Sequence, residues 1–166
     1  VHPEKRCIFV VMKGFRDQQL NLPPFDFRLG GSTAQPQIFD VLRRRFVALT
    51  PEEWVRQHFV HFLTIHLGYP SALMANEVAL HVGDKQLRAD TVLYGRDMQP
   101  RMIVEYKAPE IKITQKVFEQ ISVYNRILRV PYLVVSNGLE HFCLHLDTSQ
   151  NKYTFLAEIP PFSSLQ

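Results

Sequence analysis

The sequence predicts a mixed α/β domain, with a central sheet flanked by helices, that follows a small antiparallel β extension. Two observations carry this prediction. Residues 50–68 and 114–130 show apolar side chains at helical spacing, and between them lie three runs of strand character, at 77–82, 87–94 and 101–107. A nearly continuous apolar run follows the second helix, as expected for a strand that is covered on both faces. The predicted order of the main domain is therefore αβββαβ.

The first part of the chain has the pattern of a small sheet. Between residues 25 and 48, apolar and polar residues alternate in the segments FDFRL and QIFDV, and Gly30-Gly31-Ser32 marks a turn between them. Another short apolar run, Ile8–Met12, suggests a strand near the start. We expect residues 1–49 to form an N-terminal extension and residues 50–166 to form the main domain, together making one compact unit.

Both helices have recognisable ends. Thr50, with Glu53 three residues later, forms a capping box at the start of the first helix, and Gly68 ends it. The second helix begins after Thr114, and Pro131 stops it.

Turn residues connect the predicted strands. Gly83-Asp84 joins the first strand to the second, and Gly95-Arg96-Asp97 joins the second to the third. After the buried strand PYLVVS comes a turn at Asn137-Gly138, and the segments HFCLHL and YTFLAEI are predicted edge strands.

Composition bounds the class of protein. At 166 residues the chain is long enough for one core without disulfide or metal support, and its net charge of +3 suits a nucleic-acid partner without requiring one. Two cysteines, Cys7 and Cys143, are too few for a disulfide framework or a structural zinc site. No apolar segment approaches the roughly 18 residues that a bilayer span needs. We expect a cytoplasmic protein with free thiols and no membrane association.

Three ionisable residues fall on two neighbouring strands. Asp90 lies inside one apolar run, and Glu105 and Lys107 close the next. Because strand side chains alternate, Glu105 and Lys107 project from one face and Tyr106 from the other. Carboxylates on adjacent strands can hold a hard divalent cation, and a lysine adds positive charge where a phosphate or an attacking water would lie. The combination indicates metal-dependent phosphodiester cleavage.

The same residues also permit a structural interpretation. Asp90 could be a solvated residue at a strand end, and Glu105 with Lys107 an ordinary ion pair on one face. Acids inside apolar runs are costly unless they are paired or bind a metal, however, and this context favours a site. Gln120 and Tyr124, four residues apart on one helix face, could likewise be ordinary surface and core residues.

The order of elements, with D…ExK on the second and third strands, resembles the PD-(D/E)xK nuclease superfamily. Within it, the chain is similar to the N-terminal nuclease domain of type I restriction enzyme R subunits. The resemblance covers residues 39–146 and implies a restriction-endonuclease-like fold. The matching segments are TPEEWVRQ at 50–57, GY at 68–69, RAD at 88–90, VEYKAP at 104–109, QISVY at 120–124 and VVSNG at 134–138.

The resemblance implies a role for each matching residue. Asp90 and Glu105 would bind the metal, Mg²⁺ or alternatively Mn²⁺. Lys107 would be the catalytic lysine, and Gln120 and Tyr124 the Q-x-x-x-Y pair that accompanies the active site in this branch.

A glutamate of the first helix often adds a metal contact in this superfamily, and here Glu52 or Glu53 must supply it. We favour Glu52, because it lies along the inward stripe with Val55 and Phe59, whereas Glu53 has the capping role. The sequence departs from the superfamily pattern at Ala89, where a proline commonly precedes the aspartate.

The function that the resemblance implies is a bacterial, Mg²⁺-dependent DNA endonuclease. The alternative is a nuclease-fold module with weak or no catalysis, which binds nucleic acid or a restriction partner. The sequence has no Walker A motif, so a motor or specificity function would have to come from a separate subunit. An RNA substrate stays open at this point.

Overall fold

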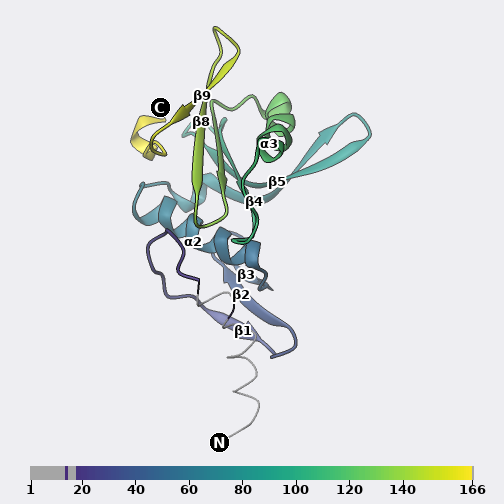
Figure 1. Cartoon of the computed structure of the whole chain (residues 1–166), viewed down its shortest axis with the longest axis vertical. Helices are drawn as coiled ribbons and strands as arrows, with labels where there is room; N and C mark the ends of the chain where they lie inside the picture. Colours follow the sequence, from purple (N-terminus) through teal and green to yellow (C-terminus); the bar gives the residue numbers. More distant parts are fainter. Residues whose placement is uncertain (1–13, 15–17, 166) are drawn as a thin grey trace, which may run out of the picture.

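The chain forms a six-stranded mixed sheet with a smaller three-stranded sheet beside it (Figure 1). The computed structural model describes residue 14 and residues 18–165, so the strand predicted at Ile8–Met12 lies outside the described residues. The helices are α2 (Pro51–Ile65) and α3 (Gln115–Leu128), with short 3-10 turns at Ser71–Leu73 and Phe162–Ser164. The strands are β1 (Leu29–Gly31), β2 (Pro36–Asp40), β3 (Arg45–Ala48), β4 (Met74–Val82), β5 (Lys85–Tyr94), β6 (Pro100–Tyr106), β7 (Tyr132–Ser136), β8 (His141–Asp147) and β9 (Lys152–Leu156).

The strand order of the large sheet confirms the predicted αβββαβ core. Strands β4, β5 and β6 form an antiparallel meander, α3 crosses over, and β7 returns parallel to β6. Strands β8 and β9 then continue the sheet as antiparallel neighbours. Strand β7 is buried at four of its five positions, as its apolar sequence predicted.

The two helices cover opposite faces of this sheet. Val104 packs in a core cluster with Val55 and Phe59 of α2, whereas its neighbour Ile103 packs in a second cluster with Ile121 of α3. Because adjacent strand residues point to opposite faces, the sheet is covered on both sides. The site residues of β5 and β6 therefore lie between two cores.

The small sheet of β1, β2 and β3 packs against α2, and Ile38 of β2 is fully buried in the α2 core. The strand prediction for FDFRL is wrong over most of its length, since of that segment only Leu29 lies in a strand. Its aromatic residues pack against the helix instead. The Phe27 ring lies 4.7 Å from that of Trp54 and 4.4 Å from that of His58, centroid to centroid.

The start of α2 follows the predicted cap in part. Thr50 Oγ1 accepts a hydrogen bond from the Glu53 backbone N–H at 3.0 Å. The Glu53 carboxylate does not return to Thr50; it accepts from Arg43 and Arg56, because charge-assisted bonds to guanidinium groups are stronger than one to a backbone amide. The capping box is therefore only half formed, and the glutamate is free to join an ion-pair network.

Helix α3 ends earlier than its proline suggested. Its last residue is Leu128, and Arg129 follows in the left-handed region with φ of 49°. Thr114 occupies the N-cap position without a side-chain hydrogen bond to the helix. No helix within the described part of the chain combines the length and hydropathy needed to cross a membrane.

Candidate active site

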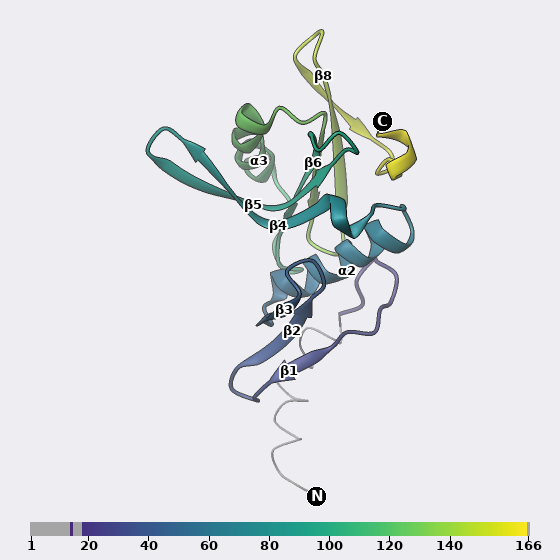
Figure 2. The same ribbon diagram turned by 180° about the vertical axis from the view of Figure 1, so that it is seen from behind.

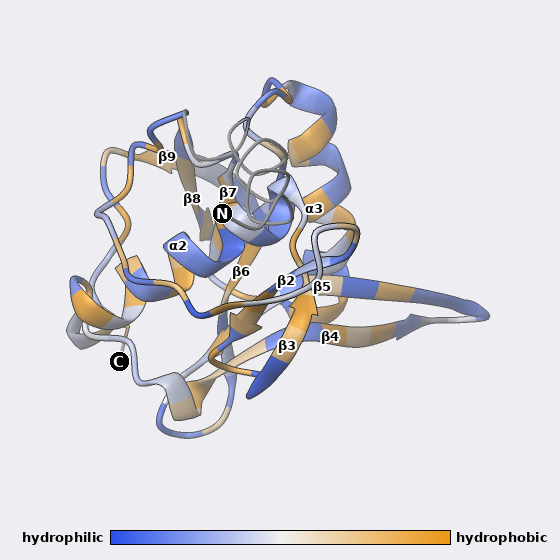
Figure 3. Ribbon diagram, turned by 90° about the horizontal axis from the view of Figure 1, so that it is seen from below, coloured by the Kyte–Doolittle hydropathy of each residue, from blue (hydrophilic) through white to orange (hydrophobic). Residues whose placement is uncertain are grey.

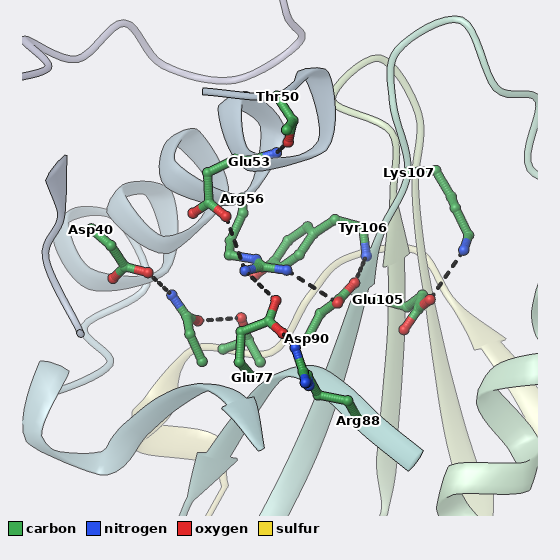
Figure 4. Close-up of polar contacts among 12 residues, drawn as sticks. Asp40, Thr50, Glu53, Arg56, Glu77, Arg88, Asp90, Glu105, Tyr106 and Lys107 are labelled. Carbon is green, nitrogen blue, oxygen red and sulfur yellow. Dashed lines mark hydrogen bonds and ion pairs between the residues drawn. The ribbon is translucent and has the colours of Figure 1, made fainter. Parts of the chain in front are cut away.

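Asp90 and Glu105 lie beside each other on adjacent strands. Thr91 pairs with Val104 across β5 and β6, which brings the two acids together at the end of the ladder. Asp90 Oδ2 also accepts a hydrogen bond from the backbone N–H of Tyr106 at 2.8 Å. The predicted pair of carboxylates on neighbouring strands is therefore assembled in the structure (Figure 4).

Glu105 is buried and only partly satisfied. Lys107 Nζ donates to Glu105 Oε1 at 3.1 Å, while Glu105 Oε2 is buried and has no hydrogen-bond partner among the described residues. Burial and the charge of Asp90 raise the pKa of Glu105 to about 7, although Lys107 opposes the rise. An unpartnered buried oxygen on such a carboxylate can be satisfied by a proton, a water molecule or a cation.

Lys107 points toward the acids, as the strand alternation predicted. Burial opposes its charged form, but Glu105, Glu52 and Asp90 outweigh this and raise the pKa of Lys107. The ammonium is therefore charged at neutral pH, so it can stabilise negative charge but cannot serve as a general base. Tyr106, between the two site residues in sequence, points the other way into the α2 core.

Helix α3 brings Gln120 and Tyr124 to the same site. Lys107 Nζ lies 3.5 Å from Gln120 Oε1, and Gln120 Nε2 lies 3.5 Å from the Tyr124 hydroxyl. Burial raises the pKa of Tyr124, so its hydroxyl keeps its proton. The polar side chains thus form a line from Glu105 through Lys107 and Gln120 to Tyr124.

Arg56, on α2, is a central residue of the site that the sequence analysis did not identify. Its guanidinium lies 3.1 Å from Glu53 Oε2, 2.6 Å from Glu77 Oε1 and 3.1 Å from Asp90 Oδ1. Its side chain is 6% exposed, so these ion pairs are shielded from water. Figure 4 shows the guanidinium between the three acids. Arg56 thereby offsets the negative charge that gathers around Asp90.

Burial and neighbouring charges of both signs shift the pKa of Asp90. Burial raises the pKa of Asp90, Arg56 and the Tyr106 N–H lower it, and Glu77 and Glu52 raise it again, with a net rise. Asp90 Oδ1 is bonded to Arg56, and Oδ2 is bonded to the Tyr106 N–H. The carboxylate is therefore held in one orientation by two fixed donors.

The same polar network reaches the small N-terminal sheet. Arg43 donates to both oxygens of Glu53 at 3.0 Å and also pairs with Asp40, which is fully buried at the end of β2. Asp40 in turn accepts from Asn76 at 2.9 Å, and Asn76 accepts from Thr91 at 2.6 Å, next to Asp90. The small sheet is thus bonded into the surroundings of the candidate site.

The two glutamates at the start of α2 have different positions. The prediction that Glu52 lies on the inward stripe is wrong: Glu53 is buried and bonded to arginines, whereas Glu52 is exposed. Glu52 takes part in no hydrogen bond or ion pair among the described residues. Glu52 is near enough to the site to raise the pKa of Asp90, Glu105 and Lys107. Within residues 14 and 18–165, no three His, Cys, Asp or Glu side chains are grouped as metal ligands.

The sequence contains weak indications of the roles of Arg56 and Glu77. Arg56 interrupts the apolar face of a helix and follows Glu53 by three residues, the spacing of an intrahelical ion pair. Glu77 stands at the start of a predicted strand, between Asn76, which pairs with Thr91, and Val78, which pairs with Ala89. Neither pattern predicts that Arg56 contacts Asp90, because the two residues are 34 positions apart in the sequence.

Comparison with known proteins shows which family the chain belongs to. Residues 51–160 match the model of the type I restriction enzyme R protein N terminus (HSDR_N). No curated protein matches the sequence. Among solved structures, the chain is similar to a fragment assigned as the HsdR subunit of a type I restriction enzyme from Vibrio vulnificus YJ016, with TM-score 0.51 and 22% identity. That match covers 70% of this chain and 24% of the other, so it concerns the fold and about a quarter of the longer protein.

Proposed function

The chain belongs to the family of type I restriction enzyme R protein N termini, and from that premise we propose that it is a metal-dependent DNA endonuclease domain. One observation carries the proposal: buried Glu105 has an unpartnered Oε2, with the charged Lys107 on its other oxygen and Asp90 beside it. Acids and a charged lysine gathered in one buried site suit phosphodiester hydrolysis better than they suit a structural ion pair.

The donor set fits a hard divalent cation. Asp90 and Glu105 Oε2 offer carboxylate oxygens, the ligand type that Mg²⁺ and Mn²⁺ favour, and exposed Glu52 stands near them on α2. These residues would hold the cation. When bound, it would supply Lewis-acid activation of the scissile phosphate and of a water molecule.

The side chains of the domain would do the remaining work. Lys107, kept protonated by its acidic neighbours, would place positive charge on the phosphate oxygens as negative charge develops there. Gln120 and Tyr124 would hold the Lys107 ammonium in position from α3. Arg56 would keep Asp90 oriented from the opposite side. The side chains that would position Lys107 and Asp90 thus come from both helices that cover the sheet.

A plasmid-nicking assay tests the proposal. With Mg²⁺ or Mn²⁺ the wild-type chain is expected to relax supercoiled DNA, and Lys107→Ala and Glu105→Gln are expected to abolish this. Lys152→Ala, which removes an exposed lysine of β9, is the matched control and is expected to cut normally. Plasmid that stays supercoiled with folded wild-type chain and either metal would instead support a nuclease-fold module that only binds. An RNA transcript incubated in parallel distinguishes the two nucleic acids.

The proposed setting follows from the family. A type I R protein acts with other subunits, so we propose that a motor and a specificity component accompany this domain on DNA. The buried free thiol of Cys143 suits a reducing compartment, which agrees with a bacterial cytoplasmic location.

A further inference from the structure

The hairpin of β4 and β5 extends beyond the body of the domain. Past Glu77 and Asp90 the two strands pair with each other, from Val78↔Ala89 to the turn at Gly83, while β6 pairs with β5 only from Thr91 onward. In Figures 2 and 3 this part of the hairpin projects as an arm. It begins at the residue that carries the candidate carboxylate.

The arm has one apolar and one polar face. Leu80 and Ala89 belong to the core cluster of α3, with Val78 and Leu87 packed against it. By strand alternation, the opposite face is formed by residues that are all exposed, namely Ala79, His81, Gln86 and Arg88. Figure 3 shows hydrophilic colour along much of the arm. No described element covers this polar face.

The polar face is continuous with Asp90. Gln86, Arg88 and Asp90 alternate along β5 onto one side, and Arg88 donates to Glu77 Oε2 at 3.0 Å. Glu77 has φ of 58°, a left-handed conformation that is rare in a strand, and the Glu77–Asp90 rung is missing from the ladder. This irregularity rotates the arm, because Asn76 and Thr91 bond on the α2 side whereas Val78 and Ala89 pack toward α3.

We propose that this polar face lies along the backbone of duplex DNA beside the cleaved bond, with Arg88, Gln86 and His81 contacting phosphates. The inference rests on the proposed function, since it extends the same site. Past Glu77, the arm carries one acid, Asp84 at its turn, against Lys85 and Arg88. The face itself presents the donors of His81, Gln86 and Arg88, and the carboxylates of Glu77 and Asp90 lie at its base, so beyond that base it suits a polyanion.

The arm is long enough to pass more than one phosphate. Gln86 lies four residue steps from Asp90, about 13 Å along a strand. The phosphates of one DNA strand rise only about 3.4 Å each along the helix axis, so an arm of this length can meet more than one of them. A two-stranded ribbon also has the dimensions to lie against a DNA groove. The arm can therefore follow one strand away from the scissile phosphate.

Position 86 gives the cleanest test, because Gln86 makes no side-chain bond to the site. Binding of a fluorescently labelled DNA duplex is measured by anisotropy without divalent cation, over a series of salt concentrations. Gln86→Lys is expected to tighten binding and Gln86→Glu to weaken it. Each phosphate contact changes the slope of log K against log [salt] by about 0.9. Gln86→Lys adds one such contact, so a fourfold rise in salt should change the ratio of the two Kd values by roughly three- to fourfold.

Lys85→Glu and Lys85→Gln are the matched controls, since Lys85 alternates onto the other face of the same strand. They are expected to move Kd and its salt slope far less than the Gln86 variants. Equal effects at positions 85 and 86, or none at 86, would overturn the assignment of this face.

The outcome for this face is separable from that of the proposed function. If the wild type cuts plasmid and the Gln86 variants bind alike, the arm is not a DNA contact and the endonuclease proposal stands. If the Gln86 variants shift DNA binding and no preparation cuts, the arm proposal stands alone. If the wild type binds no duplex at any salt concentration, the arm proposal fails, and plasmid nicking alone decides the endonuclease proposal.

Discussion

Arg56 and Asp90 form a shielded ion pair, Nη2 to Oδ1 at 3.1 Å, that joins α2 to β5 at the candidate active site. The same guanidinium serves Glu53 and Glu77, so one cation is shared among three acids. Burial works to lower the pKa of Arg56, but the three acids outweigh it and raise that pKa. The consequence is a fixed positive charge behind Asp90, on the side away from Lys107.

Replacing Arg56 should therefore affect stability and function together. Arg56→Met removes the cation but keeps much of the side-chain volume, and it leaves buried acids facing one another at a cost of about 3–5 kcal/mol of unfolding free energy. Arg56→Lys keeps the charge but cannot reach three carboxylates, and a smaller loss is expected. Urea denaturation followed by circular dichroism measures both.

If Arg56 positions Asp90, its replacement should lower DNA cleavage without weakening DNA binding. In folded Arg56→Lys, nicking by a saturating amount of enzyme should fall while DNA binding without metal stays near wild type, because Asp90 is misoriented and the DNA contacts are intact. Arg44→Lys, at an exposed arginine in the turn between β2 and β3, is the control. Unchanged nicking with lowered stability would make Arg56 purely structural.

The raised pKa of Glu105 predicts an unusual dependence of stability on pH. The folded state binds this proton more tightly than the unfolded state does, so the favourable contribution is present below the ordinary pKa of 4.5. It is lost as the pH rises toward about 7. Glu105→Gln lacks this titration. In EDTA, its stability relative to wild type should rise across that window, by about 3 kcal/mol at most.

The measurement is a set of urea unfolding curves at several pH values. Glu119→Gln, which removes an exposed carboxyl of α3, should track wild type throughout. Parallel pH curves for wild type and Glu105→Gln would contradict the prediction. Adding Mg²⁺ above pH 7 should stabilise the wild type and leave Glu105→Gln unchanged, because a cation would replace the proton on the carboxylate.

Gln120 and Tyr124 should contribute unequally. Gln120→Ala removes the group that holds Lys107, whereas Tyr124→Phe removes only a hydroxyl one step further along. A hydrogen bond of this kind is worth about 0.5–1.5 kcal/mol, so cleavage should fall by roughly tenfold at most for Gln120→Ala and less for Tyr124→Phe. Initial nicking rates measure this, with Ser122→Ala on the same helix as the control. A larger loss for Tyr124→Phe would place the tyrosine nearer the substrate.

Local patterns were sufficient for part of the fold and site. The alternation around Glu105 and Lys107 placed both on one face, because the period of a strand is fixed by its backbone. The helix start at Thr50 and the turn at Gly83 were predictable from side chains that act within a few residues. The same local reasoning placed Gln120 and Tyr124 on one face of α3.

What the sequence could not supply depends on distant partners. Phe25 and Phe27 alternate like strand residues, yet their rings pack on α2, and no local signal distinguishes the two outcomes. Glu77 adopts a left-handed conformation that its residue type does not favour, and it does so where Arg56 and Arg88 bind its carboxylate. The backbone conformation of Glu77 thus depends on tertiary ion pairs, which local propensity does not predict.

Asp40 gives a last prediction, on how the small sheet supports the site. Its buried carboxylate accepts from the Leu42 and Arg43 backbone N–H groups at 2.8 and 2.9 Å and from Asn76, and it pairs with Arg43. Burial opposes its charge, but these donors outweigh that and lower the pKa of Asp40. Its contribution to stability is therefore present above pH 3.8 and is lost as the pH falls through the folded pKa.

Asp40→Asn should cost roughly 1–3 kcal/mol of unfolding free energy at neutral pH, because Arg43 loses one of its two counter-ions and the new side-chain amide N–H faces other donors. Since Arg43 still binds Glu53, the orientation of Arg56 and Asp90 should persist, so nicking per folded molecule should stay near the wild-type level. Asp26→Asn, at an exposed carboxylate of the same region, is the control and should alter neither quantity. A different result would be a nicking rate that falls by a larger factor than the folded fraction of the protein does. That result would show that the small sheet positions Asp90 through Arg43 and Glu53.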